Sequence, residues 1–230
     1  MNLSDDRASV FGRIREALRR PAPHRHAHDQ PGAEGVPETN EFRAWLPAVG
    51  PSLEERIELF AQNSTTLKTD FREVASEAEA VRQLHVLASE NQWKRVASHS
   101  DSLAARVAGQ LSLPCLYTDS GYSPTELERC DAALTDCDAL VAQTGSVMVT
   151  APSAGGRALS VLPPHHVVIA RRSQMVPDLA AAYQLAREKY APNWPSFLSF
   201  ITGPSRTGDI ERILVLGAHG PKKLTIFLVP

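Results

Sequence analysis

Apolar positions from residue 41 onward follow two patterns that alternate along the chain. Short runs rich in valine, isoleucine and leucine predict buried β-strands, and apolar residues spaced three and four apart predict helices. The first helix follows a capping box formed by Ser52 and Glu55, ahead of Ile57 and Phe60. Strands are predicted at 67–74, 95–97, 113–117, 139–142, 146–150, 166–170, 197–201 and 224–229, with helices at 76–88, 101–111, 126–134 and 177–190.

Strands that alternate with helices of about ten residues predict βαβ units. The expected fold class is therefore α/β, a three-layer architecture with a mainly parallel sheet. In such sheets ligands bind at the carboxyl ends of the strands. This rule places three loops together as candidates, at 143–145, 154–157 and 203–206.

The first 40 residues differ from this body. Residues 1–20 carry apolar side chains such as Phe11 at helical spacing among five arginines, which predicts an amphipathic helix that packs on the domain, on a second copy or on a partner. Residues 21–40 are rich in Pro, Gly, Ala and His without periodicity and predict a flexible linker, so the α/β domain is expected at 41–230. Within the linker His24, His26 and His28 alternate, but they lack further ligands, and no metal site is expected.

Composition narrows the class of protein. The chain has 230 residues and a formal net charge of −2 with both signs interspersed, which argues against nucleic acid or an anionic membrane surface as partner. Cys115, Cys130 and Cys137 form no C-x-x-C pair, so neither a zinc site nor an iron–sulfur cluster is expected in this chain. No apolar run approaches the roughly 20 residues that span a bilayer, and the first residues do not resemble a signal peptide. A cytoplasmic protein is expected, and the sequence leaves open whether it forms a homo-oligomer.

The richest polar stretch follows the strand at 197–201. Gly203 and Pro204 end the apolar run, and Ser205, Arg206 and Thr207 follow. Free backbone N–H groups at a glycine turn, two hydroxyls and a guanidinium suit a carboxylate or a phosphate. The alternative is a capped turn, with Ser205 or Thr207 at the start of a new segment and Arg206 paired with Asp209 or Glu211.

The two other loops carry weaker signals. Gln143, Thr144 and Gly145 offer an amide, a hydroxyl and a tight turn between two apolar runs, although Thr-Gly is also an ordinary hairpin connection. Gly156 and Arg157 combine a flexible backbone with a second guanidinium that could close over an anion, or they form a solvated surface loop. Neither a P-loop nor G-x-G-x-x-G after a strand is present, so nucleotide binding has no direct support.

Candidate proton-transfer groups are few. His165 and His166 precede an apolar strand, and His219 lies among glycines and a proline. Asp209 and Glu211 are the carboxylates beside the arginine turn. Asp209, Glu211 and His219 are the catalytic candidates if the protein moves protons, and no nucleophilic triad is evident, since G-x-S-x-G is absent.

Several segments together resemble the lactate utilization protein C family, which is built on the LUD domain. They are Gln143-Thr144-Gly145-Ser146, Gly156-Arg157-Ala158-Leu159-Ser160 with Leu162-Pro163, Val176-Pro177, Ile201-Thr202-Gly203-Pro204-Ser205-Arg206-Thr207-Gly208-Asp209-Ile210-Glu211 and Leu216-Gly217-Ala218-His219-Gly220-Pro221. The resemblance holds from about residue 135 to the C-terminus, and residues 1–20 also resemble the start of that family. Two positions depart from it, because the family often has an acidic residue at Gln143 and alanine at Gly208.

The resemblance implies a fold similar to the sugar-phosphate isomerase and CoA-transferase superfamily. It also implies a part in oxidising L-lactate to pyruvate beside partner proteins, at least one of which carries iron–sulfur clusters. Gln143 cannot serve as the glutamate nucleophile of CoA transferases, which argues against acyl transfer. Two alternatives stay open: a stand-alone isomerase-like or transferase-like enzyme acting on a phosphorylated substrate, and a scaffold for an iron–sulfur partner.

Overall fold

The computed structural model describes residues 11–13, 15–16, 46–207, 215–216 and 220–230. Residues 11–13 and 15–16 are helical, and the rest of the predicted N-terminal helix and linker lies outside the described residues. The chain divides into two units, Met1–Trp45 and Leu46–Pro230.

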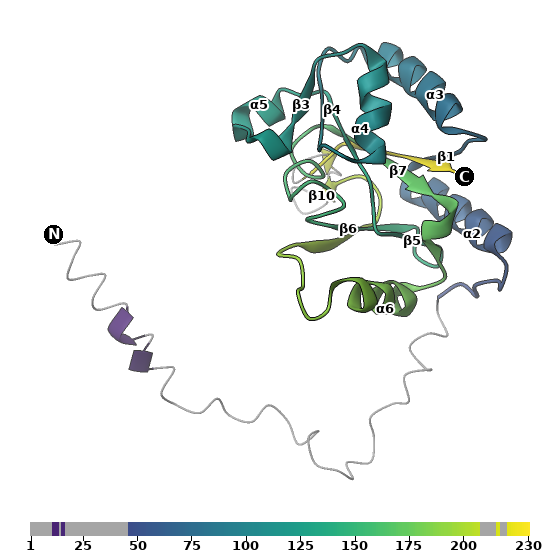
Figure 1. Cartoon of the computed structure of the whole chain (residues 1–230). Helices are drawn as coiled ribbons and strands as arrows, with labels where there is room; N and C mark the ends of the chain where they lie inside the picture. Colours follow the sequence, from purple (N-terminus) through teal and green to yellow (C-terminus); the bar gives the residue numbers. More distant parts are fainter. Residues whose placement is uncertain (1–10, 14, 17–45, 208–214, 217–219) are drawn as a thin grey trace, which may run out of the picture. The chain divides into compact units, whose positions relative to one another are not determined.

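A six-stranded parallel sheet forms the centre of the second unit (Figure 1). Its strand order is β1-β12-β7-β4-β2-β3, so the last strand of the chain lies between the first strand and β7. The strands are β1 (Asp70–Glu73), β2 (Val96–Ser98), β3 (Cys115–Tyr117), β4 (Ala132–Thr135), β7 (His165–Arg171) and β12 (Lys223–Val229). Strands β4 and β7 are buried along nearly their whole length, as expected for strands covered on both faces.

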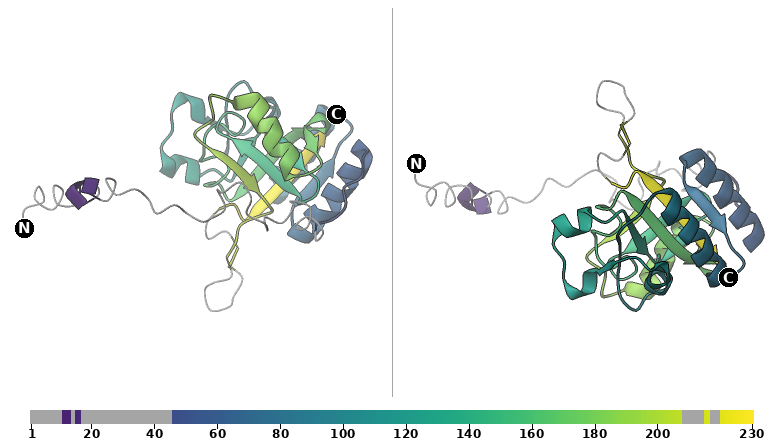
Figure 2. Two further views of the ribbon diagram at one scale, coloured as in Figure 1. Left: turned by 90° about the horizontal axis from the view of Figure 1, so that it is seen from below. Right: turned by 90° about the horizontal axis from the view of Figure 1, so that it is seen from above.

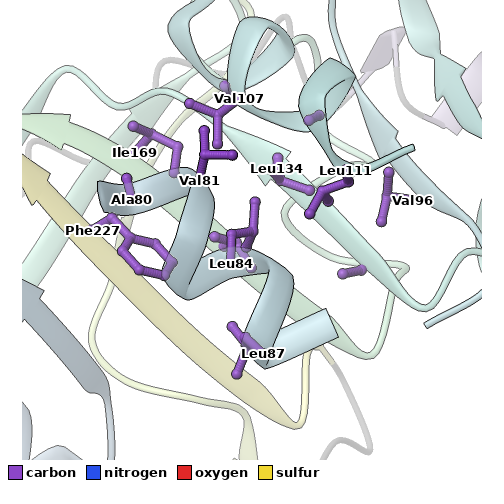
Figure 3. Close-up of a cluster of buried hydrophobic side chains, with 14 of the residues drawn as sticks. Ala80, Val81, Leu84, Leu87, Val96, Val107, Leu111, Leu134, Ile169 and Phe227 are labelled. Carbon is purple, nitrogen blue, oxygen red and sulfur yellow. The ribbon is translucent and has the colours of Figure 1, made fainter. Parts of the chain in front are cut away.

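Helices α3 (Glu77–Glu90) and α4 (Leu103–Ala108) cover one face of this sheet. Leu84 of α3 and Phe227 of β12 are completely buried in the resulting core (Figure 3). The other face packs against α2 (Leu53–Leu67) and a second sheet, through a core that includes Phe60 and Ile226. The prediction of a layered, mainly parallel α/β fold is therefore confirmed.

The second sheet has four strands in the order β8-β5-β6-β9. These are β5 (Ala139–Val141), β6 (Ser146–Thr150), β8 (Met175–Val176) and β9 (Leu198–Ile201). Its outer face is covered by α6 (Leu179–Tyr190), which lies in front in the left view of Figure 2. No helix among these residues has both the length and the apolar character needed to cross a bilayer.

Local signals account for most helix starts. The capping box predicted at Ser52 is present: its Oγ accepts from the Glu55 backbone N–H at 3.2 Å, and its own N–H donates to Glu55 Oε2 at 2.9 Å. Ser76 caps α3 by accepting from Glu79 N at 3.1 Å. Such caps satisfy backbone donors that lack a partner inside the helix.

Three predicted elements are wrong in type or extent. Residues 126–134 were expected to be one helix, but they divide into α5 (Pro124–Glu128) and β4, because Ala132 to Leu134 fill a fully buried place in the sheet. Helix α2 runs to Leu67, so β1 begins only at Asp70. Ser205 begins no helix, because Arg206 and Thr207 form β10 (Arg206–Thr207), which pairs antiparallel with β11 (Val215–Leu216); the residues that Thr207 would cap lie outside the described residues.

Candidate functional site

The turn at Gly203 to Arg206 lies beside the C-terminal end of α2. Gly203 has φ +86°, and a Cβ there would come within 3.0 Å of the Leu67 carbonyl oxygen. Arg206 donates a hydrogen bond from Nη2 to this same carbonyl. Because helix C-terminal carbonyls lack partners within the helix, this contact is a structural use of the guanidinium. The suggested ion pair with Asp209 or Glu211 lies outside the described residues.

The hairpin turn at 143–145 packs against the same end of α2. A Cβ on Gly145 would come within 2.9 Å of Asn63 Cβ. Asn63 Nδ2 donates to the carbonyl oxygens of Ala142 and Gln143 at 2.8 and 3.1 Å. The Gln143 side chain donates to the Pro47 carbonyl at 3.0 Å, and its amide is therefore engaged in holding the chain.

Hydroxyl groups connect this hairpin to the arginine turn. Thr144 Oγ1 lies 2.8 Å from Ser146 Oγ, which in turn lies 2.8 Å from Thr202 Oγ1. Ser205 donates its backbone N–H to the Pro221 carbonyl at 2.9 Å. The structure therefore brings two of the three predicted loops together, and it uses most of their polar groups in the fold.

The third loop lies elsewhere. Gly155 (φ +59°) packs on His99, and a Cβ at this glycine would lie 2.3 Å from His99 Cβ. Arg157 donates to the Ser196 carbonyl at 2.5 Å, and its guanidinium lies 6.0 Å from the centre of the Phe197 ring. The expectation of one site shared by all three loops is not met, because the arginine turn lies near the amino ends of β7 and β12 and this loop lies near the carboxyl end of β2.

A pocket of about 410 Å³ opens next to the arginine turn. It lies where β1, β12 and β7 begin, since Asp70, Lys223 and His165 are the first residues of these strands. Its lining residues are Lys68, Asp70, Leu87, Asn91, His165, Pro204, Arg206, Lys222, Lys223, Leu224 and Thr225. We call it the cationic pocket, because four of these residues are basic and Asp70 is the only carboxylate among them.

The four cations differ in what they contact. Arg206 is bound to the Leu67 carbonyl, and Lys223 Nζ donates to Asn91 Oδ1 at 2.5 Å. Lys68 and Lys222 form no ion pair with any residue that the structure describes. Asp70 is paired with Arg72 at 2.8 Å and so neutralises neither lysine. Among the described residues that line the pocket, positive charge therefore exceeds negative charge, although the whole chain is slightly negative.

The pocket floor contains polar groups that the residue pattern did not single out together. His165 Nε2 lies 2.8 Å from Thr225 Oγ1, and Thr225 Oγ1 donates to Asp70 Oδ2 at 3.4 Å. Burial, and secondly the Lys223 charge, lower the pKa of His165 to about 4. Burial lowers the pKa of the neighbouring His166 to about 3, so both imidazoles are neutral at pH 7.

A second cleft, of about 350 Å³, lies at the opposite edge of the sheet. His99, Asp136 and Arg171 follow or end the parallel strands β2, β4 and β7, and all three line it with Ser153 and Lys189. We call it the carboxyl-edge cleft. This is where ligands collect in open α/β sheets, and the sequence pattern had pointed to none of these residues.

The groups in the carboxyl-edge cleft are largely paired. Asp138, whose side chain is fully buried beside it, accepts from Lys189, Tyr190 and Thr150 at 2.7, 2.6 and 2.7 Å. Burial acts to raise the pKa of Asp138, but these hydrogen bonds outweigh it and keep the pKa below its usual value. His99 is 6% exposed, and its Nδ1 has no partner among the described residues. Burial lowers the pKa of His99, although Asp136 and Asp119 oppose the shift.

The proton-transfer candidates Asp209, Glu211 and His219 lie outside the described residues, as do Gly208 and the Thr207 side chain. Among the described residues no group of His, Cys, Asp and Glu side chains could hold a metal ion. Cys130 and Cys137 are buried free thiols, and Cys115 is partly buried and also free. Burial raises the pKa of all three thiols, which leaves them unreactive at neutral pH.

The LUD domain family model matches residues 124–229 of this layered fold. The chain belongs to the lactate utilization protein C family: it is 31% identical over 185 residues to the "Lactate utilization protein C" of Exiguobacterium sp., a match that covers 78% of this chain and 80% of that protein.

Other relatives match over a shorter stretch. The proteins of the same name from Deinococcus radiodurans and Bacillus subtilis are 33% identical over 120 residues and 35% identical over 104 residues, which is 52% and 44% of this chain and 56% and 43% of theirs. The crystal structure of a DUF162 family protein from Deinococcus radiodurans superposes with a TM-score of 0.61 at 21% identity, over 79% of this chain and all of that one. This likeness concerns the fold alone, and the expected similarity to sugar-phosphate isomerases and CoA transferases stays a prediction.

Proposed function

We propose that the chain takes part in lactate utilization by binding a small carboxylate in the cationic pocket. The observation that carries this proposal is the unbalanced charge of Lys68 and Lys222 beside Arg206 and Lys223 around one cavity. A carboxylate placed there would gain charge-assisted hydrogen bonds from the Lys68 and Lys222 ammonium groups, which have no ion-pair partner among the described residues. Membership of the lactate utilization protein C family makes lactate or pyruvate the first acids to test.

The volume of the pocket is compatible with this ligand and with a larger one. The pocket encloses about 410 Å³, which lies within the range of about 300 to 1,000 Å³ that ligand sites commonly enclose. This volume is larger than a three-carbon acid. The apolar wall of Leu87, Pro204 and Leu224 would face the methyl group or further carbon atoms. A phosphorylated ligand uses the same cations, and inorganic phosphate therefore belongs in the experiment as a competing anion.

Arg206 has a double role in this proposal. Its guanidinium lines the pocket while Nη2 holds the end of α2 at Leu67. An Arg206→Ala variant would therefore lose ligand affinity and stability together. The unpaired lysines are the sharper probes, because no described contact of the fold depends on their ammonium groups.

The test is calorimetric titration of the chain and its Lys68→Gln/Lys222→Gln variant with L-lactate, pyruvate and inorganic phosphate at low ionic strength. The double variant is expected to weaken acid binding by about tenfold or more, since each charge-assisted contact contributes on the order of 1 kcal/mol or more. Lys94→Gln, which removes an exposed lysine outside the pocket, serves as the matched control and should bind as the parent does. Equal affinity in all three proteins, or phosphate binding alone, would remove the carboxylate assignment.

We further propose that the chain works beside iron–sulfur proteins that carry the electrons. This rests on the family resemblance and on the absence of a C-x-x-C pair among the three cysteines of the sequence. Lactate oxidation by the partner proteins should be measured with and without this chain. A rate that does not depend on the chain would contradict its place in the system.

A second candidate function is favoured by the carboxyl-edge cleft. There His99 joins Arg171 and Lys189, a set that could hold an anionic substrate and accept a proton from it. The chain would then be a stand-alone isomerase-like enzyme on a phosphorylated substrate. Turnover by the purified chain, lost in His99→Gln, would favour this reading over a purely binding role.

A further inference from the structure

One side of the cationic pocket is formed by the Asp70 carboxylate, which can only accept hydrogen bonds. Thr225 is 1% exposed and His165 is 4% exposed, so both lie behind the pocket surface. The side chain of Asp70 is 43% exposed and is the member of this group that solvent reaches. Asp70 also accepts from Arg72 Nε at 3.0 and 3.1 Å, which holds its carboxylate in one orientation.

The hydrogen bonds behind the pocket run in one direction. Thr225 donates its only hydroxyl proton to Asp70, so its oxygen accepts from Nε2–H of the neutral His165. Thr225 and Arg72 thus donate hydrogen bonds to Asp70 from within the protein. Since a carboxylate has about four lone-pair positions, acceptor capacity remains on the side of Asp70 that faces the pocket.

The strand register places the acceptor Asp70 and the cation Lys223 on the same wall of the pocket. Asp70 is the direct neighbour of Thr225 in the parallel pair β1–β12. Lys223 lies two residues before Thr225 on the same face of β12, and both line the pocket. Two residues along a strand span roughly 6.6 Å. Asp70 and Lys223 therefore lie on adjacent strands at the same wall of the pocket, so an acid whose carboxylate is held by Lys223 can present a group on its second carbon to Asp70.

We propose that Asp70 makes the cationic pocket selective for 2-hydroxy acids over 2-keto acids, with the hydroxyl group of the ligand donating to the Asp70 carboxylate. This inference rests on the proposed function of the pocket. A keto oxygen in the same place carries only lone pairs and is repelled by the carboxylate. The protein would thus bind the reduced acid that enters a lactate oxidation and release the oxidised one.

Three acids of nearly equal size separate the contribution of the hydroxyl group from that of the carboxylate. L-lactate has a hydroxyl on its second carbon, pyruvate has a keto oxygen, and propionate has neither. Calorimetric titration of the full chain is expected to show L-lactate binding about tenfold or more tighter than propionate, with pyruvate weakest. In Asp70→Asn the side chain offers donors as well as an acceptor, so the ratio of lactate to pyruvate affinity should fall to about one or below.

Arg72→Gln is the matched control. It removes the same Arg72–Asp70 ion pair as Asp70→Asn but keeps the carboxylate, so the preference for L-lactate should survive. Thermal unfolding of both variants establishes that the fold is retained. Equal affinity of the parent chain for all three acids would overturn the selectivity and leave the anion pocket standing, as would a preference for pyruvate. Failure of every acid to bind would overturn both the selectivity and the proposed function.

Discussion

Two adjacent histidines at the centre of the sheet predict that the protein loses stability in mild acid. His165 and His166 begin β7, which lies between β12 and β4. His166 is 1% exposed, and its Nε2 lies 2.9 Å from Thr135 Oγ1, while its Nδ1 has no partner among the described residues. Burial holds the pKa of His165 at about 4 and that of His166 at about 3 in the folded chain.

The direction of this pH dependence follows from the protonation of the two histidines in the unfolded and the folded chain. In the unfolded chain both histidines have a pKa of about 6.5 and bind protons below it, whereas the folded chain keeps both neutral. The unfolded state therefore binds more protons, and the free energy of unfolding falls as the pH drops below about 6.5. At pH 5 each histidine lowers it by up to about 2 kcal/mol relative to pH 7, since each pH unit is worth about 1.4 kcal/mol. The pair together is a large share of a typical stability of about 5–15 kcal/mol.

The assay is urea unfolding followed by circular dichroism at several pH values between 5 and 7 at constant ionic strength. The slope of the unfolding free energy against pH should correspond to uptake of about two protons near pH 5, with His99 adding in the same direction. Asp138 does not interfere in this range, because its pKa is lowered and its stabilising effect is lost only at more acidic pH.

A matched pair of variants tests the origin of this slope. His166→Gln keeps an amide for Thr135 but cannot be protonated, so the slope should fall by about one proton. His85→Gln, which changes an exposed histidine on α3 that contacts the Gln110 carbonyl, is measured beside it as the control for replacing a histidine by glutamine. Equal unfolding free energies at pH 7 and pH 5, or an unchanged slope in His166→Gln, would refute the reasoning.

Three further predictions concern stability and are checked by thermal or urea unfolding. Gly155→Ala should lower the free energy of unfolding by about 2 kcal/mol or more, because the added Cβ would lie 2.3 Å from His99 Cβ at a φ of +59°. Gly156→Ala is also at positive φ but has open space around it, so it should cost less stability. The reverse order of the two losses would contradict this account. Asp138→Ala should cost about 3 kcal/mol, because it leaves buried donors without their acceptor, and a loss below about 1 kcal/mol would speak against that role. Ser52→Ala should cost about 1 kcal/mol through loss of the α2 cap, and an unchanged stability would show that the capping box contributes nothing.

Much of the fold could be predicted from local patterns. The continuous apolar run of β7, the buried strand β12 and the capping box of α2 are specified by neighbouring residues. The segment at 126–134 could not be predicted in this way. Alanine and leucine favour helices in isolation, but Ala132 to Leu134 are completely buried between β2 and β7, and tertiary packing overrides their local preference.

Some residues of the candidate site could likewise be predicted from the local sequence, and others could not. The residues at 203–206 were singled out by their chemistry, and of these Pro204 and Arg206 line the cationic pocket, whereas Gly203 and Ser205 do not. Lys68 and Asp70, the partners that complete it, precede them by more than 130 residues and carry no local signal. Gly156 and Arg157 were expected in the same site, but the loop that carries them lies beside His99 at the other edge of the sheet.

By itself, the sequence determined the family, the order of most helices and strands, and a turn rich in anion-binding groups, because each of these depends on residues close together in the chain. Only the tertiary structure decided which turns meet. Strand β12 inserts between β1 and β7, and this single choice of strand order brings Lys222 and Lys223 to Lys68 and Asp70. Strand order depends on how the whole core packs, which no local pattern encodes.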